Sequence, residues 1–157
     1  MKCYLTRLYV LILFFILTTF IFPQVENNIK LIYVQSESGD THTSSSKIIL
    51  YFDGSIEKYS KVSGKGEMLT ASSKLNQNEI NYIDRIFSKY NFLDYPDKIP
   101  LVKTPMWPSS STGVKYKACQ ECEIKTFSIS TNSERQHIPS NYYEFNKELR
   151  AELYSHF

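Results

Sequence analysis

Residues 47–62 read KIILYFDGSIEKYSKV and predict a β-hairpin, which sets the fold class of the chain. The run Lys47–Phe52 is apolar, and Ser55–Val62 continues after the turn with alternating character. Asp53-Gly54 between two strand-like runs is a strong hairpin signal, because both central residues of such a turn adopt positive φ. We therefore expect two antiparallel strands joined by a tight turn.

The sequence before this hairpin predicts one more strand and a loop. Residues Ile29–Val34 read IKLIYV, a short stretch that is rich in β-branched and aromatic residues, as strands are. Ser36–Ser46 is rich in serine and threonine, and we interpret it as a loop. Gly64 and Gly66 close the strand region, which then holds three strands.

A helix is predicted to begin just after Asn76. Asn76 is a good N-cap, and Glu79 three residues later completes a capping box. Leu75 and Ile80 occupy the two positions of a hydrophobic staple. The apolar face of this helix consists of Ile80, Ile83, Phe87 and Tyr90. Asn91 suits the left-handed position after the helix, which brings Phe92 within reach of Phe87.

Residues 94–113 are punctuated by proline and are predicted to be an extended segment on the surface. Prolines at four positions exclude a regular helix or a central strand: Pro96, Pro100, Pro105 and Pro108. Trp107, flanked by Pro105 and Pro108, is the candidate interaction residue, because prolines reduce the ordering cost of binding and tryptophan is a favoured anchor. The alternative is that Trp107 folds back as a lid over the hydrophobic face.

The last third of the chain predicts two strands and a helix. The strands are Val114–Ala118 and Ile124–Ser130, and the helix spans about Asn141–Tyr154 with Ser140 or Asn141 as its cap. The apolar stripe of this helix is Tyr142, Phe145, Leu149 and Leu153. The resulting order βββαββα predicts an α+β fold, with two helices on one face of a mainly antiparallel sheet.

Cys119 and Cys122 are the one pair of residues with clear chemical potential. A C-x-x-C pair can be a structural disulfide, two free thiols, a redox couple or half of a metal site. A redox couple exploits a helix start, whereas strand-like sequence follows here, and a zinc site needs more ligands than three scattered histidines supply. The sequence therefore favours a local disulfide, and we expect neither a metal nor a cofactor.

The first 24 residues have the pattern of an export signal. Lys2 and Arg7 precede the apolar run Leu8–Phe22, as in a signal peptide, although no small residues mark a cleavage point near Phe22. We expect residues 1–24 to be a cleaved signal, with an uncleaved anchor formed by residues 8–22 as the alternative and a buried cytosolic helix as a third. Residues 25–157 then form a single domain in a periplasmic or secreted setting, where disulfides persist.

The charge balance argues against nucleic acid as a partner. The chain has 18 basic and 16 acidic side chains, and Lys2 and Arg7 account for the whole excess. A neutral domain without a basic block lacks the field that attracts nucleic acid. Aromatic residues make up 15% of the chain, including 12 tyrosines, which argues against disorder.

Two carboxylate arrangements suggest hydrolytic chemistry only weakly. Asp94 and Asp97 flank a proline and are typical turn residues, although paired carboxylates serve some hydrolases. Asp40 and His42 lie in the serine-rich segment without a nucleophile motif around them. The sequence thus favours an exported non-enzymatic protein that binds a protein or surface component of the cell envelope. The alternative is a small exported enzyme, either a thiol oxidoreductase using Cys119 and Cys122 or an unrecognised hydrolase.

Overall fold

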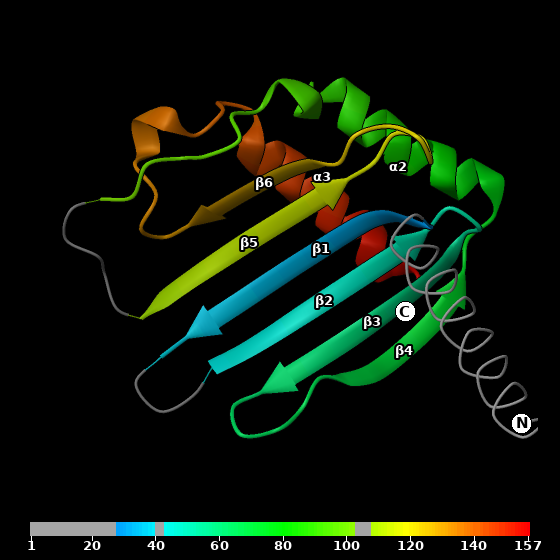
Figure 1. The fold of residues 1–157 in the computed structure, drawn as a ribbon, viewed down its shortest axis with the longest axis horizontal. Coiled ribbons are helices and arrows are strands. Elements are labelled where there is room, and N and C mark those ends of the chain that lie inside the picture. Colours follow the sequence, from blue (N-terminus) through cyan, green and yellow to red (C-terminus); the bar gives the residue numbers. More distant parts are fainter. Residues whose placement is uncertain (1–27, 40–42, 103–107) are drawn as a thin grey trace, which may run out of the picture.

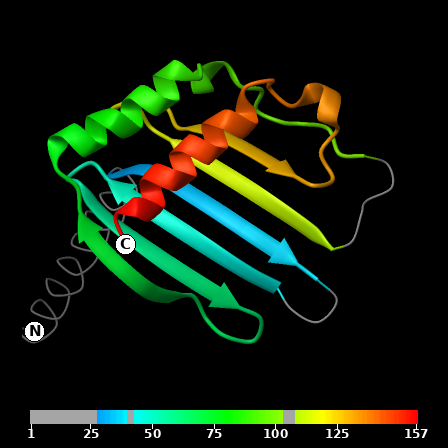
Figure 2. The same cartoon turned by 180° about the vertical axis from the view of Figure 1, so that it is seen from behind.

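A computed structural model describes residues 28–39, 43–102 and 108–157. These residues form a six-stranded sheet in the order β4-β3-β2-β1-β5-β6, in which every pairing is antiparallel. Two helices, α2 and α3, lie on the same face of the sheet (Figure 1 and, from behind, Figure 2). The elements are β1 (Ile29–Ser38), β2 (Thr43–Tyr51), β3 (Ser55–Val62), β4 (Met68–Lys74), α2 (Gln77–Lys89), β5 (Ser109–Tyr116), β6 (Lys125–Ser130) and α3 (Tyr142–Ser155), with 3-10 turns at Phe92–Asp94 and Arg135–His137. The predicted α+β class is confirmed.

The predicted export segment, residues 1–24, lies outside the described residues. Among the helices that the structure does describe, none has the length and apolar character needed to span a membrane.

The β2–β3 hairpin forms as predicted, but its turn differs from the expected one. Gly54 alone takes positive φ (87°), while Asp53 does not, and the amide of Gly54 donates to the carbonyl of Tyr51 at 3.1 Å. This is the three-residue loop in which a left-handed glycine follows a turn. The Asp53 carboxylate accepts from the Ser55 amide at 2.9 Å. A side chain at Gly54 would also meet the Leu75 carbonyl oxygen at 2.6 Å, so glycine is required twice over.

The prediction of a loop over Ser36–Ser46 is wrong at both of its ends. β1 continues to Ser38 and β2 begins at Thr43, and they pair up to Ser38 opposite Thr43. β1 also pairs with β5 on its other side. Because partners on both sides satisfy its backbone groups, this segment stays in the sheet although its side chains are polar.

The structure adds a strand that the sequence did not indicate. β4 pairs with β3 alone and forms an edge of the sheet, and nearly all of its side chains are exposed. It therefore lacks the apolar alternation by which strands are recognised. A bulge at Thr70, whose hydroxyl donates to the Lys58 carbonyl at 3.0 Å, interrupts its ladder.

Helix α2 begins and ends as predicted. The Asn76 side chain accepts from the amides of Asn78 and Glu79, and the Glu79 carboxylate accepts from the Asn76 amide at 2.6 Å. Asn91 takes the left-handed conformation after the helix, with φ 51°. Phe92 then meets Phe87 edge to face, with ring centroids 4.9 Å apart. The start, the end and the aromatic contact are confirmed.

The proline-punctuated segment is shorter than predicted. After the turn Phe92–Asp94 the chain runs without regular structure to Val102, and residues 103–107 lie outside the described residues. Residues 109–113, predicted to be extended surface chain, are the first half of β5 and pair with β1 and β6. This correction follows from the position of the last proline, because no residue after Pro108 prevents strand pairing.

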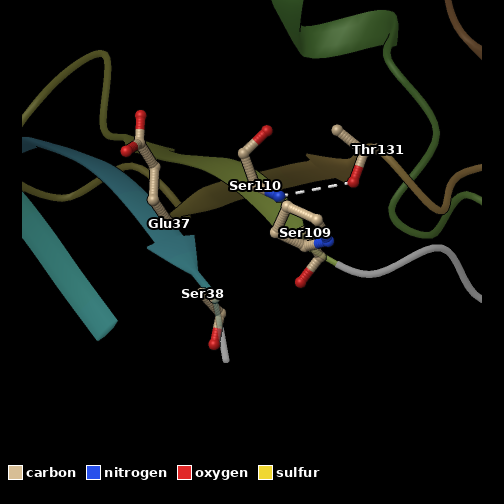
Figure 3. A pocket seen from close by; sticks show the side chains of 7 residues that line it. Glu37, Ser38, Ser109, Ser110 and Thr131 are labelled. Carbon is tan, nitrogen blue, oxygen red and sulfur yellow. Dashed lines mark hydrogen bonds between the residues drawn. The ribbon is translucent and has the colours of Figure 1, made fainter. Parts of the chain in front are cut away.

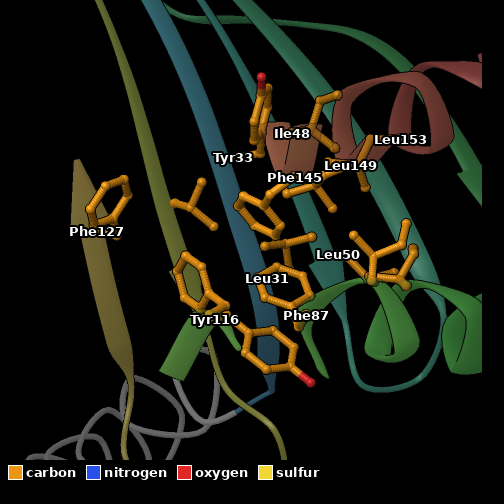
Figure 4. Packing of buried hydrophobic residues seen from close by; sticks show 14 of the residues in the cluster. Leu31, Tyr33, Ile48, Leu50, Phe87, Tyr116, Phe127, Phe145, Leu149 and Leu153 are labelled. Carbon is orange, nitrogen blue, oxygen red and sulfur yellow. The ribbon is translucent and has the colours of Figure 1, made fainter. Parts of the chain in front are cut away.

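The core fills the space between the sheet and the two helices. Figure 4 shows side chains of β1, β2, β5 and β6 meeting those of α2 and α3. Phe87 stacks on Tyr116, with ring centroids 3.7 Å apart, and Phe92 stacks on Phe145 at 5.2 Å. The predicted stripe of α3 is buried in full: Tyr142, Phe145, Leu149 and Leu153.

Buried tyrosines account for part of the high tyrosine content. The hydroxyl of Tyr33 donates to Asn146 at 2.9 Å, that of Tyr95 to Asn141 at 3.0 Å, and that of Tyr116 to Asp84 at 2.8 Å. A tyrosine can enter a core at low cost when its hydroxyl has a partner. These three tyrosines are almost fully buried.

Lys30 is a buried cation that connects β1 to α2. A bulge in β1 accompanies it, and only 4% of its side chain is exposed. Its ammonium lies 2.9 Å from the Asp84 carboxylate, which also accepts from Tyr116. A buried ammonium requires such a partner. The pair therefore fixes how α2 lies against the sheet.

The start of α3 is held differently from the prediction. Asn141 precedes the helix, but its side chain forms no capping bond within it. The side-chain NH₂ of Asn141 instead donates to the backbone carbonyl of Tyr90 at 2.9 Å, and its side-chain oxygen accepts from the Tyr95 hydroxyl. Asn141 thereby fastens the start of α3 to the end of α2.

Candidate functional site

Cys119 and Cys122 form a disulfide in the connection between β5 and β6. Their Cα atoms are 5.0 Å apart, and the Cys122 amide donates to the Cys119 carbonyl at 3.1 Å across a turn. The predicted pairing of the two cysteines is confirmed. Strand β6 begins at Lys125, and within the described residues no helix starts at either cysteine, so neither sulfur gains the helix dipole that lowers a thiol pKa.

Replacing Cys119 and Cys122 together with serine should lower the free energy of unfolding by only about 1–2 kcal/mol, because so short a closed loop restricts the unfolded chain little. Urea unfolding of the oxidised wild type and the double variant measures this difference. Alkylation of unreduced, denatured protein followed by peptide mapping provides the control, since it separates both sites from Cys3. Alkylated Cys119 and Cys122 in that map would contradict a structural disulfide.

Of the three predicted interaction residues, the structure places one. Pro108 lines a pocket at the end of the sheet, whereas Pro105 and Trp107 lie outside the described residues. The pocket has a volume of about 360 Å³ and lies where β1 ends and β5 begins. Its described lining is Glu37, Ser38, Gly39, Pro108, Ser109, Ser110 and Thr131.

The side chains of this pocket divide between the two faces of the sheet. Figure 3 shows Glu37 and Ser110 pointing to one side, and Ser38 and Ser109 to the other. Glu37 lies directly opposite Ser110 in the β1–β5 ladder, and the Ser110 amide donates to the Thr131 hydroxyl at 3.3 Å. Glu37, Ser110 and Thr131 therefore present one carboxylate and two hydroxyls on the face that carries the helices.

Two further hollows continue from this pocket along α3. The next hollow, of about 180 Å³, shares Ser110 and Thr131 with the pocket and reaches Tyr143 and Asn146. A third, of about 470 Å³, shares Tyr143 and Asn146 and runs on along the helix. We call the three together the α3 groove. Its principal polar and aromatic residues are Glu37, Ser110, Ser111, Thr112, Ser130, Thr131, Tyr142, Tyr143, Asn146, Lys147, Arg150 and Tyr154.

The floor of the α3 groove is fixed by hydrogen bonds to the sheet. Asn146 accepts from Tyr33, and the hydroxyl of Tyr154 lies 3.1 Å from that of Ser46. Burial raises the pKa of Tyr142 to about 12, while its hydrogen bond with Thr112 opposes this shift. Rigid side chains of this kind lower the ordering cost of binding a ligand.

No match to this chain is found among models of known protein families or among curated proteins.

The candidate hydrolytic residues that the structure describes, Asp94 and Asp97, do not line the α3 groove. Asp97 pairs with Lys125 at 2.8 Å, and this hydrogen bond lowers the pKa of its carboxyl, which suits an ion pair better than a general acid. Asp94 is the last residue of the 3-10 turn Phe92–Asp94 and is exposed. Asp40 and His42 lie outside the described residues. Within the described ranges, no three His, Cys, Asp or Glu side chains are placed to hold a metal ion.

The groove residues were missed at the level of sequence, although two signals were present. Serines and threonines recur in 44–46 and 109–112, which were interpreted as loop or linker rather than as strands. On the last helix, Tyr143, Lys147, Arg150 and Tyr154 recur at helical spacing beside the apolar stripe. A second stripe next to a buried one indicates the boundary of a helix–sheet groove.

Proposed function

We propose that the protein is exported and acts outside the cytoplasm as a non-enzymatic binding protein whose ligand is a component of the cell envelope. The observation that carries this proposal is the α3 groove, three connected hollows lined with hydroxyl, amide and aromatic side chains. Binding sites combine an apolar or aromatic wall with a few oriented polar groups. The basic-apolar leader and the Cys119–Cys122 disulfide support an oxidising, extracytoplasmic setting.

The groove offers hydrogen bonds and ring contacts rather than an activated nucleophile. The Thr131 hydroxyl accepts from the backbone amide of Ser110, and the Tyr142 hydroxyl is hydrogen-bonded to Thr112. A serine nucleophile needs an adjacent base, and among the described residues of this ladder the nearest carboxylate is that of Glu37, on an exposed strand end. Recognition of a polar ligand is the chemistry that this lining supports best.

Filling the groove should abolish retention on cell envelopes. Ser110→Trp and Thr131→Trp place an indole in the hollow, while Ser72→Trp places one on the exposed strand β4 as the matched control. We expect wild type and Ser72→Trp to sediment with purified envelopes of the source cell. The amount of each groove variant that sediments should be at least five-fold lower. Wild type that stays in the supernatant, or groove variants that sediment like wild type, would contradict the proposal.

Fractionation of the producing cells supplies the control for location. We expect the chain outside the cytoplasm, with Cys119 and Cys122 oxidised. Full-length chain in the cytosol with both thiols reduced would remove the envelope assignment.

A further inference from the structure

Helix α3 separates its charges onto two sides. Its acids recur every four residues, at Glu144, Glu148 and Glu152. Glu148 faces α2, where its carboxylate binds Lys89 at 2.6 Å and the hydroxyl of Tyr90 at 2.7 Å. The cations of the helix, in contrast, line the groove.

Lys147 and Arg150 are the groove cations, and both are exposed. Within the described part of the chain, neither forms an ion pair. Arg150 lies 5.6 Å from the centroid of the Tyr154 ring, and Lys58 of β3 reaches the same ring at 4.5 Å. This end of the groove is therefore positive, while the Glu148 carboxylate binds α2 and that of Glu152 lies 3.2 Å from His156.

The middle of the groove is suited to a hydroxylated ring. Tyr143 is 62% exposed and lines the second and third hollows, so its ring is accessible to a partner, and its other neighbour is the ring of Tyr142 at 5.5 Å. Beside it stand the hydroxyl of Thr112 and the amide of Asn146, whose oxygen is taken by Tyr33, which leaves the amide NH₂ as a donor. From Tyr143 to Tyr154 the helix extends about 16 Å, enough for several linked units.

We infer that the α3 groove binds an acidic oligosaccharide, with its carboxylates at Lys147 and Arg150 and one sugar ring against Tyr143. This inference rests on the proposed binding function and adds the ligand class to it. Guanidinium and ammonium groups bind carboxylates by charge-assisted hydrogen bonds, while hydroxyls and the amide bind the sugar hydroxyls. A peptide of acidic residues would satisfy the cations but would bring no sugar ring to Tyr143.

Calorimetric titration with tetragalacturonate tests the inference. Two matched probes distinguish recognition of the charge from recognition of the sugar. The fully methyl-esterified tetramer keeps the hydroxyls and lacks the charge, and tetraglutamate keeps the charge and lacks the sugar. We expect tetragalacturonate to bind at least ten-fold more tightly than either probe, and its affinity to fall with added salt. Equal binding of tetraglutamate, or absence of tetragalacturonate binding at millimolar concentration, would overturn the inference.

Variants place the ligand in the groove. K147Q/R150Q should weaken tetragalacturonate binding at least ten-fold. K61Q/K65Q makes the same charge change at the exposed end of β3 and in the turn after it, and should stay within two-fold of wild type. Tyr143→Ala should weaken binding about five-fold and Tyr143→Phe should restore it, because the ring is retained. Unchanged affinity in K147Q/R150Q with an unchanged unfolding curve would move the site elsewhere and overturn the inference.

The two experiments fail separately. If the envelopes retain the protein through the groove but no acidic sugar binds, the inferred ligand class is wrong while the proposed binding function is supported. If the envelopes do not retain it either, both fall.

Discussion

Replacing Phe92 with alanine should lower the free energy of unfolding by about 3–5 kcal/mol. Phe92 is fully buried where the end of α2 meets α3 and the sheet. Its ring contacts Phe87 edge to face and stacks on Phe145, with centroids 4.9 and 5.2 Å apart. Alanine at this position leaves a cavity bordered by rigid rings that cannot close over it. A loss of this size is a large part of the total stability of a small domain.

Leu93→Ala is the matched control, because Leu93 is the next residue in the same 3-10 turn and is 56% exposed. We expect it to change the free energy of unfolding by less than about 0.5 kcal/mol, as surface substitutions do. Urea unfolding followed by tyrosine fluorescence or circular dichroism measures both variants. Similar losses for the two substitutions would mean that this turn does not hold the aromatic core.

The elements with strong local signals were predictable from the sequence. The capping box at Asn76, the left-handed Asn91 and the Phe87–Phe92 contact all depend on residues within a few positions of each other. The α3 stripe likewise follows from spacing alone. Local chemistry is visible in the sequence because its physical cause is local.

Strand extent was not predictable, because it depends on distant partners. Ser36 stays in β1 since Ser45 lies opposite it on one side and Ser111 on the other. The sequence of residues 36–46 does not indicate these partners, and serine-rich sequence is more typical of loops. β4 was missed for a different reason, because an exposed edge strand needs no apolar alternation.

Most of the candidate site could not be predicted from the sequence, because its residues are brought together only by the fold. The α3 groove joins Glu37 of β1 to Ser110 of β5 and to Asn146 of α3, which are far apart along the chain. Each is an ordinary polar residue by itself, and only the strand order and the position of α3 bring them together. The cysteine pair, by contrast, carried its chemistry in its spacing and was identified correctly.

The protein should lose stability steeply as the pH rises from about 10 to 12. Burial raises the pKa of Tyr95 and of Tyr142 to about 12, and it raises the pKa values of Tyr33 and Tyr116 further. The unfolded chain releases these protons near pH 10, the ordinary tyrosine value, whereas the folded chain keeps them. Above pH 10 the folded state therefore binds more protons than the unfolded state, so the free energy of unfolding falls with pH. The stabilisation is complete below pH 10 and is lost as the pH passes the folded pKa.

Tyr142→Phe isolates one such tyrosine from the lysines that titrate in the same range. Between pH 8 and 11.5, wild type should lose about 2 kcal/mol more than this variant, since each buried tyrosine contributes about 1.4 kcal/mol per pH unit once the unfolded form is ionised. The comparison uses the change with pH, because loss of the Thr112 hydrogen bond shifts the variant at every pH. Tyr143→Phe, one residue along and exposed, should follow wild type throughout. If Tyr142→Phe and wild type lost stability in parallel, the Tyr142 hydroxyl would have to ionise as freely in the folded protein as in the unfolded chain. The burial of Tyr142 between α3 and the sheet would then be wrong.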